Sequence, residues 1–409
     1  MATLLLVIIY IAFISLGLPD AVLGASWPVM HRDLAVPIEL AGLLQMTIAG
    51  GTIVSSMNAG RVLRRFGTGR ITTFSVALTA AALLGFSFFP SFVWYFIAAI
   101  PLGIGAGAVD TGLNAFVAQH YQSRHMSWLH SFWGVGALGG PLILSRFLAS
   151  GGTWREAYRS IGTFQWVLVV ILIASLPLWR RLSSSSHPTP SATTPPEPAA
   201  GVEGAVAKGP EEAKGGHPSM RQLLSIRGVP FALLSFLFYC GLEASMGLWG
   251  GSWLVEVKGL DPADAAFWVM FFYIGIAGGR FLTGFATAWF SNRDLVRWGT
   301  VFAGVGVLLL MLPLPLPLPL AGILLVGLGC APVFPCLIHE TPAFFGASHA
   351  QGIIGLQMSA AYIGVTFFPP FFGLVSRFAG LWLLPLFLAA YAVLLFGSSE
   401  RLRRVKARG

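Results

Sequence analysis

The chain has 409 residues, of which 56% are hydrophobic and 10% are charged, and its mean hydropathy is +0.76. Soluble domains carry about 25% charged residues, so this composition excludes a water-facing globular protein and favours one that lives in lipid. The formal net charge of +9 comes from Lys and Arg that border apolar runs. Because basic and aromatic residues do not interleave, the charge does not indicate a nucleic-acid partner.

Apolar segments long enough to cross a hydrocarbon layer of about 30 Å recur along the chain. At about 20 residues per span, the chain has room for twelve helices and short loops. The first segment lacks the basic start of a cleaved signal, so we expect it to be retained as the first helix. The expected helices cover residues 3–25, 38–58, 70–90, 93–118, 127–149, 157–179, 229–256, 264–289, 294–312, 318–342, 349–373 and 378–398.

Two stretches interrupt this pattern. Residues 182–220 contain SSSSHPTPSATTPPEP and are rich in Ser, Pro, Ala, Gly and Glu. Such a composition buries too little apolar area to offset its chain entropy, so we expect a disordered cytoplasmic linker. It separates an N-terminal six-helix bundle (1–181) from a C-terminal six-helix bundle with a basic tail (221–409). The alternating Pro-Leu run at 313–320 excludes a helix there and predicts an extended turn.

The basic residues predict the orientation of the chain. Of the 25 Lys and Arg, 18 fall in loops or tails on one side of the expected spans, 6 fall on the other side, and one, Arg280, lies inside a span. Cytoplasmic loops carry an excess of Lys and Arg. The richer side is therefore predicted to be the cytoplasm, with both termini on it.

Short motifs of the first half recur in the second half in the same order. The pairs are residues 20–24 with 243–247, 49–51 with 277–279, 103–106 with 327–330, and 145–147 with 376–378. Four ordered pairs at separations of about 223 to 231 residues indicate a duplication. The halves differ in charge, because the counterpart of Asp110 is Phe334.

Three carboxylates fall inside expected spans: Asp20, Asp110 and Glu243. A charge in the bilayer costs several kcal/mol, so its default interpretation is functional. Arg280 can neutralise at most one of the three. The others need a proton, a bound cation or a wet cavity, and we expect all three to serve proton coupling. A structural hydrogen bond to a neighbouring helix is the alternative for each.

Helical spacing aligns each carboxylate with candidate ligand contacts. Asp110 shares a face with Asn114, Glu243 with Tyr239, and Asp20 with Gly24. Carboxylates, small residues and aromatic rings on one face suit a polyol, whose hydroxyls and apolar ring face they would contact. The expected substrate-binding residues are Asn114, Trp27, Gln45, His130, Trp133, Tyr239, Trp253, Tyr273 and Gln357.

For several of these residues a structural role is an open alternative. Trp27 and Trp253 lie near expected helix ends, where a membrane-interface position is as reasonable. Gln45 and Gln357 can form interhelical hydrogen bonds. His130 can act as a gate or interface residue, or carry a proton.

The sequence does not indicate a catalytic, metal-binding or ATP-binding site. Cys240, Cys330 and Cys336 fall in apolar segments, where they suit packing better than a disulfide or metal site. The sequence has no GxxxxGK[ST] phosphate loop, no Cys/His cluster with metal-ligand spacing and no HExxH. We therefore expect no enzyme activity, cofactor or metal, and transport driven by an ion or solute gradient. A membrane sensor is disfavoured, since no soluble domain is present.

Several motifs resemble a known family. The stretch GRVLRRFGTGR at 60–70 resembles the cytoplasmic signature loop of the major facilitator superfamily, with Arg64 where that signature usually has Asp. The DTGLN stretch at 110–114, LHSFWG at 129–134 and the Gly279-Arg280 pair resemble the fucose permease branch and its uncharacterised inner-membrane relatives.

The resemblance implies an all-α fold of twelve transmembrane helices in two pseudo-symmetric six-helix bundles. It implies proton-coupled sugar import, with Asp110 and Asp20 as coupling residues. The residues themselves are compatible with either H⁺ or Na⁺ as the coupling ion. Arg64, Arg65 and Arg280 are expected to take part in gating. We expect a monomer in a cell membrane, the inner membrane of a bacterium. The alternative is a proton-coupled exporter of drugs or metabolites, because residues 136–141 partly resemble the antiporter signature.

Overall fold

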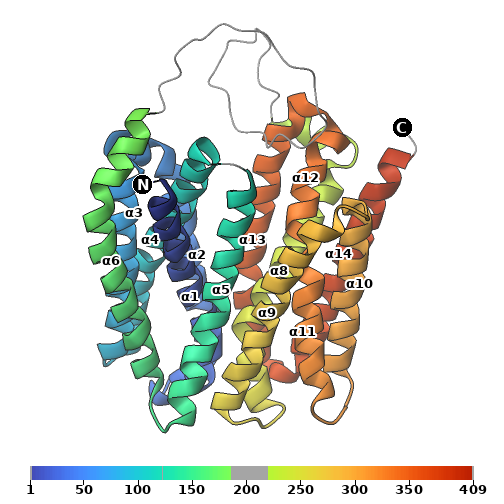
Figure 1. The fold of residues 1–409 in the computed structure, drawn as a ribbon. Coiled ribbons are helices and arrows are strands. Elements are labelled where there is room, and N and C mark those ends of the chain that lie inside the picture. Colours follow the sequence, from blue (N-terminus) through green and yellow to red (C-terminus); the bar gives the residue numbers. More distant parts are fainter. Residues whose placement is uncertain (1, 122, 186–219, 408–409) are drawn as a thin grey trace, which may run out of the picture.

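The computed structural model describes residues 2–121, 123–185 and 220–407, and Figure 1 shows them as two groups of long helices. The first group contains α1 (Ala2–Asp33), α2 (Leu40–Phe66), α3 (Thr68–Phe88), α4 (Phe92–His120), α5 (Ser123–Ala149) and α6 (Trp154–Ser185). The second contains α7 (Met220–Ser225), α8 (Val229–Glu256), α9 (Pro262–Ala286), α10 (Asn292–Met311), α11 (Leu318–Cys330), α12 (Val333–Phe345), α13 (Ala347–Ala379), the short 3₁₀ helix η1 (Leu381–Leu383) and α14 (Leu384–Ala407).

Twelve helical segments of the described chain are long and apolar enough to cross a membrane, and α11 and α12 together form one of them. The expected all-α fold with twelve transmembrane helices is confirmed. Most helices extend beyond the expected apolar segments, and α2, expected to end at 58, continues to Phe66. Polar turns of such a helix keep their backbone hydrogen bonds outside the hydrocarbon layer, so hydropathy underestimates helix length.

The tenth span differs from the single helix expected at 318–342. It is divided into α11 and α12, and the break falls at Ala331 and Pro332. Pro332 has no N–H to donate to the preceding turn, so the hydrogen-bond ladder is interrupted there. Its ring fills space beside Gly299 of α10, where an added Cβ would lie 2.5 Å from the proline Cγ.

The non-helical turn at the Pro-Leu run is shorter than the one expected at 313–320. Helix α10 ends at Met311 and α11 begins at Leu318, which places Pro319 and Leu320 in the first helical turn. The first turn tolerates proline because its N–H groups have no intrahelical acceptor. Alternating proline therefore prevents a helix only as far as Pro317.

The linker expected at 182–220 lies mostly outside the described residues. At its edges, α6 continues to Ser185 and the short α7 begins at Met220. The basic tail expected at the end of the chain belongs to α14, which is helical through Ala407.

Matching close contacts relate the two halves. In the first half, α4 touches α2 so closely that a Cβ on Gly103 would lie 2.1 Å from the carbonyl oxygen of Ile48. In the second half, α11 touches α9 in the same way, with Gly327 at 2.1 Å from the carbonyl oxygen of Phe272. Gly327 follows Gly103 in the sequence by the same number of residues as Phe272 follows Ile48. The duplication therefore extends to the packing of these helices.

The contact between α1 and α5 is also repeated, by α8 and α13. A Cβ on Gly136 of α5 would lie 2.1 Å from the carbonyl oxygen of Ile14. The counterpart in α13, Gly364, would meet the carbonyl oxygen of Leu237 at 2.5 Å. Small residues let helix backbones approach this closely in a membrane.

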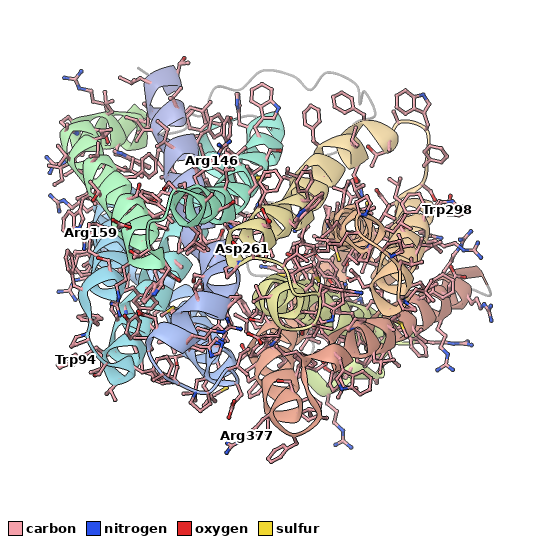
Figure 2. All side chains as sticks on the ribbon, turned by 90° about the horizontal axis from the view of Figure 1, so that it is seen from below. Trp94, Arg146, Arg159, Asp261, Trp298 and Arg377 are labelled. Carbon is pink, nitrogen blue, oxygen red and sulfur yellow. The ribbon has the colours of Figure 1, made fainter. Side chains whose placement is uncertain are left out.

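The two halves meet along α1 with α8, α5 with α9, and α2 with α13. The start of α1 and the end of α14 lie at the upper end of Figure 1, which we call the terminal face. The other end, seen from below in Figure 2, is called the opposite face. Trp94 of the first half and Trp298 of the second half lie at the outer rim in that view, and both are exposed, as expected for residues that face lipid.

Ion pairs join the two halves at the opposite face. Arg32 at the end of α1 pairs with Glu256 at the end of α8. Arg377 of α13, labelled in Figure 2, pairs with Glu39 before α2 at 3.2 Å.

Backbone contacts close the same side. A Cβ on Gly24 of α1 would lie 2.1 Å from the carbonyl oxygen of Gly247 in α8. A Cβ on Gly42 of α2 would lie 2.5 Å from Pro370 Cα in α13. The halves are therefore held together from the middle of the bundle to the opposite face.

Candidate transport site

Asp20 lies near the middle of α1 and has an exposed side chain. The indole Nε1 of Trp133 on α5 donates a hydrogen bond of 2.8 Å to Asp20 Oδ2. Asp20 also interacts electrostatically with Asp110 of α4 and with Tyr273 of α9. Since these neighbours belong to both halves, Asp20 faces the interior of the bundle and not the lipid.

The helix around Asp20 depends on a side chain from α6. Pro19 cannot donate to the carbonyl of Ser15, four residues earlier, and leaves that acceptor free. Gln165 of α6 donates its Nε2 to the Ser15 oxygen at 2.7 Å and accepts from the hydroxyl of Thr79 at 2.9 Å. Gln165 is almost fully buried. This hydrogen-bond chain satisfies the free carbonyl one turn before Asp20.

Asp110 has a neutral partner on its own helix. The amide Nδ2 of Asn114 donates 2.9 Å hydrogen bonds both to Asp110 Oδ1 and to the Asp110 carbonyl oxygen. The Oδ1 of Asn114 is buried and has no hydrogen-bond partner among the described residues. Tyr362 of α13 interacts with Asp110 and with Ser56 of α2, so the second half also reaches this carboxylate.

Glu243 is the carboxylate that Arg280 neutralises. The Nη2 of Arg280 on α9 lies 3.8 Å from Glu243 Oε2. Tyr239, one turn before Glu243 on α8, donates its hydroxyl to the same oxygen and accepts from Arg280 Nη2 at 3.3 Å. The sequence limits Arg280 to one carboxylate, and the structure identifies which one.

Trp133 connects this pair to Asp20 across the two halves. The guanidinium carbon of Arg280 lies 5.3 Å from the centre of the Trp133 ring, within the range of a cation–π interaction. The helices are close here, because a Cβ on Gly134 would lie 2.5 Å from the Cβ of Ala277 on α9. Asp20, Trp133, Arg280 and Glu243 therefore form one continuous chain of contacts.

Two further predicted residues lie beside this chain. Tyr273 of α9 is buried and interacts electrostatically with both Asp20 and Glu243. His130 of α5, about one turn from Trp133, is exposed, stands edge-on to Phe13 with ring centres 6.0 Å apart, and interacts with Arg280. Their roles in substrate binding remain predictions.

The two tryptophans expected near helix ends are packed elsewhere. Trp27 is fully buried and donates its indole N–H to the Ile38 carbonyl oxygen at 2.7 Å. Trp253 is buried, and Lys258 Nζ lies 5.2 Å from the centre of its ring. Neither has a contact with the three carboxylates among the described residues.

The two glutamines also lie apart from the carboxylates. Gln357 is buried on α13 and accepts from the Thr341 hydroxyl at 3.0 Å, which is the interhelical hydrogen bond left open by the sequence. Gln45 is half-buried on α2 and has no hydrogen bond among the described residues.

Arg64 and Arg65 occupy the last turn of α2 and are exposed. Basic side chains there complement the negative end of the helix dipole. The chain then turns into α3 through Gly67, whose φ of 81° favours glycine. Both arginines are far along α2 from the carboxylate chain, and their gating role remains a prediction.

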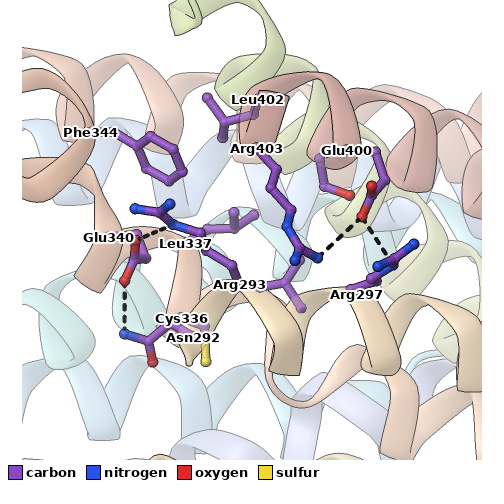
Figure 3. Close-up of a pocket in the computed structure, with 12 residues that line it drawn as sticks. Asn292, Arg293, Arg297, Cys336, Leu337, Glu340, Phe344, Glu400, Leu402 and Arg403 are labelled. Carbon is purple, nitrogen blue, oxygen red and sulfur yellow. Dashed lines mark hydrogen bonds and ion pairs between the residues drawn. The ribbon is translucent and has the colours of Figure 1, made fainter. Parts of the chain in front are cut away.

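A second charged cluster lies among the ends of α10, α12 and α14, and Figure 3 shows it in close-up. Arg293 Nε contacts Glu340 Oε2 at 2.9 Å, and Arg297 Nε contacts Glu400 Oε1 at 3.3 Å. Arg403 reaches Glu400 at 3.9 Å. Because both glutamates are paired with arginine, this cluster ties helix ends together and is not a carboxylate site for a coupling ion.

Sequence reasoning missed Gln165, Thr79 and Tyr362. Gln165 has a detectable signal, because a proline in a helix implies an unsatisfied carbonyl four residues earlier that needs a donor. Which helix provides that donor depends on packing. Tyr362 and Thr79 give no local signal, since a single polar residue in an apolar span has many possible partners.

A family model described as the Major Facilitator Superfamily matches residues 9–369. Similar curated proteins include Bypass of stop codon protein 6 of Saccharomyces cerevisiae, 22% identical over 92% of this chain and 78% of that protein. The glucose/mannose transporter GlcP of Bacillus subtilis is 26% identical over 82% of this chain and 79% of its own length. Membrane protein MosC of Rhizobium meliloti is 22% identical over 92% and 85%.

Solved structures of the same fold include a bacterial homologue of the human lysosomal transporter Spinster. Its inward-facing, unoccupied conformation matches with a TM-score of 0.74 and 14% identity over 98% of both chains. Its inward-facing, occupied conformation matches with a TM-score of 0.69 and 14% identity over 99% of this chain and 97% of that one. At this identity the likeness establishes the fold.

The twelve spans, the repeated contacts and the family match point to one conclusion. The match covers both halves of the chain, and the structural likeness extends over nearly all of it. The narrower resemblance to the fucose permease branch remains a prediction. The chain belongs to the major facilitator superfamily, and it is a membrane transporter and not an enzyme.

Proposed function

We propose that this transporter is a proton-coupled symporter of a sugar or a similar small neutral solute, working by alternating access of its two halves. The resemblance to the fucose permease branch is the source of the proposed sugar–proton symport. We further propose that the protein acts as a monomer. The terminal face lies in the cytoplasm of a bacterial cell, as the excess of Lys and Arg on that side predicts.

The observation that carries ion coupling is the unequal pairing of the three carboxylates. Glu243 has Arg280 beside it. Asp20 has the neutral donor Trp133, and Asp110 has the neutral donor Asn114. An ionised carboxylate within a membrane-spanning bundle is costly without a cation beside it. Asp20 and Asp110 are therefore the groups that would take up a coupling ion, and Asp110 is the principal proton acceptor in our proposal.

A neutral solute fits the charge of the same site. Asp20, Asp110 and Glu243 together outnumber Arg280, so an anionic solute would be repelled. The unpartnered Oδ1 of Asn114 is free to accept from a hydroxyl, and aromatic side chains at the site can cover an apolar sugar face. The similarity to a glucose/mannose transporter is consistent with this substrate class.

The closed opposite face supports an inward-facing state, if the terminal face is cytoplasmic. The pairs of Arg32 with Glu256 and of Arg377 with Glu39 would then be the outer closure. They must break for the solute to enter from outside, and rocking of the halves about the site would expose it there.

Purified protein in liposomes tests the proposal. Uptake of radiolabelled neutral hexoses is measured with an inward pH gradient, with an inward Na⁺ gradient, and with neither. We expect uptake above the equilibrium level only with the pH gradient, and none for uronic acids or hexose phosphates. Accumulation driven by Na⁺ alone, or export driven by the pH gradient, would contradict proton symport.

A further inference from the structure

We propose that Trp133 is a positioning residue that transmits the charge state of Asp20 in the first half to Arg280 in the second half. This inference rests on the proposed proton coupling. It assigns Trp133 a role different from the sugar contact predicted from sequence, because its polar edge and its ring face are both engaged by protein groups.

The indole of Trp133 contacts both halves of the protein. Its Nε1 donates to Asp20 Oδ2 at 2.8 Å. Its ring lies 5.3 Å from the Arg280 guanidinium carbon. A single rigid side chain on α5 thus contacts an acid on α1 and a base on α9. Any rotation that breaks one contact also changes the other.

Protonation of Asp20 changes the strength of its hydrogen bond from Trp133. A hydrogen bond to an ionised acceptor is roughly twice as strong as one between neutral groups. When Asp20 binds a proton, its hold on the indole N–H weakens, and the ring is free to turn away from Arg280. Other charged or titratable groups around this point are Asp110 on α4, His130 on α5, and Glu243 and Tyr273 on the second half.

The contacts of Arg280 leave it able to change partners. Its Nη2 lies 3.8 Å from Glu243 and 3.3 Å from the Tyr239 hydroxyl, both longer than a strong charge-assisted hydrogen bond. Its Nε is buried and has no hydrogen-bond partner among the described residues. Loss of the Trp133 ring would let Arg280 move closer to Glu243 or to a bound solute.

Helices α5 and α9 form a contact between the two halves at this point. Gly134, next to Trp133, lies against Ala277, about one turn from Arg280. This close packing keeps the indole and the guanidinium next to each other at the contact between α5 and α9. Trp133 and Arg280 therefore respond to the charge of Asp20 at a contact between the two halves.

The substitution Trp133→Phe tests the proposal because it keeps a ring for Arg280 and removes the N–H for Asp20. Without that donor, the neutral form of Asp20 is relatively more favourable. We expect the high-pH limit of proton-driven uptake to move upward by about one pH unit. Trp128→Phe is the matched control, because Trp128 is exposed on the same helix and should leave the profile unchanged.

Double variants separate positioning from substrate contact. If Trp133 acts through Asp20, the pH profile of Asp20→Asn with Trp133→Phe should equal that of Asp20→Asn alone. Additive shifts, or a raised KM with an unchanged pH profile, would overturn the proposal.

Arg280→Lys provides a second route if Trp133→Phe does not fold. It keeps the charge and weakens the ring contact, so a smaller upward shift is expected, and an unchanged profile would count against the proposal. Thermal unfolding in detergent checks that each variant is folded. Absence of proton-driven uptake in the unmodified protein would instead reject the proposed function.

Discussion

Single residues around Asp20 depend on one another in a way that can be measured. Pro19 leaves the Ser15 carbonyl without its helical donor, and the buried Gln165 supplies a replacement at 2.7 Å. The substitution Gln165→Leu would leave that carbonyl buried and unsatisfied. We expect a loss of about 1–3 kcal/mol in the free energy of unfolding and reduced uptake.

Thermal unfolding in detergent measures this loss. Thr163→Ala on the same helix is the control, because Thr163 is exposed and bonds only within its helix. Equal melting temperatures for the Gln165 and Thr163 variants would mean that the Ser15 carbonyl does not need Gln165.

Two carboxylates of the site are expected to respond oppositely to neutralisation. Glu243→Gln leaves Arg280 without its ion-pair partner, so it should lower the melting temperature. Asp110→Asn replaces a carboxylate that has no cationic partner among the described residues with a neutral group of the same shape, so it should leave the melting temperature unchanged or raise it. Differential scanning fluorimetry of both variants gives the comparison. A stable Glu243→Gln and an unstable Asp110→Asn would contradict the assignment of Glu243 as the carboxylate that is paired with Arg280.

The sequence predicted part of this site. Charges inside spans identified Asp20, Asp110 and Glu243, and spacing along α4 and α8 identified their neighbours Asn114 and Tyr239. Periodicity along one helix does not specify its partner on another helix. For that reason the pairing of Glu243 with Arg280 and the bond from Trp133 to Asp20 required the structure.

At the scale of helices, the two ion pairs of the opposite face form a reciprocal arrangement. The first half contributes Arg32 and Glu39, and the second half contributes Glu256 and Arg377. These pairs are partly exposed, so each contributes at most about 1 kcal/mol. That amount is still enough to change the ratio of two conformations about fivefold.

Charge reversal tests whether these pairs hold the opposite face closed. Arg377→Glu places two acids together and should increase thiol labelling of a cysteine introduced at Ser252, a buried residue of α8 next to the contact of Gly251 with α1, by about fivefold or less. Glu39→Arg in addition should restore the lower labelling rate. Arg159→Glu is the control, since Arg159 lies at the same face (Figure 2) and stacks on Phe88 of its own half. Equal labelling in all three variants would show that the Arg377–Glu39 pair does not hold the opposite face closed.

The membrane-spanning helices could be predicted because a helix in lipid must be apolar along most of its length, and hydropathy measures this property. Hydropathy does not record where a hydrogen-bond ladder stops. Pro332 breaks the tenth span within an apolar segment, while Pro319 is accepted in a first turn. The difference depends on the position of each proline relative to the helix start, which the structure fixes.

For the whole molecule, the duplication supplies the scaffold and the unequal charges supply the function. Gly103 and Gly327 repeat the same backbone contact in the two halves, and Asp20 and Glu243 occupy matching positions. The helices that carry Asp110 and Phe334 have diverged, and Phe334 instead packs against Phe236 and Tyr239. The sequence predicted this inequality, because it requires only the alignment of one half with the other.

The central claim is that a proton moves with the solute through Asp110. It is tested most directly by recording the external pH of weakly buffered proteoliposomes when a transported sugar is added. We predict sugar-induced alkalinisation with the unmodified protein. With Asp110→Asn we predict no alkalinisation, while sugar counterflow, which needs no net proton movement, continues. Alkalinisation and gradient-driven uptake that persist in Asp110→Asn would contradict the account.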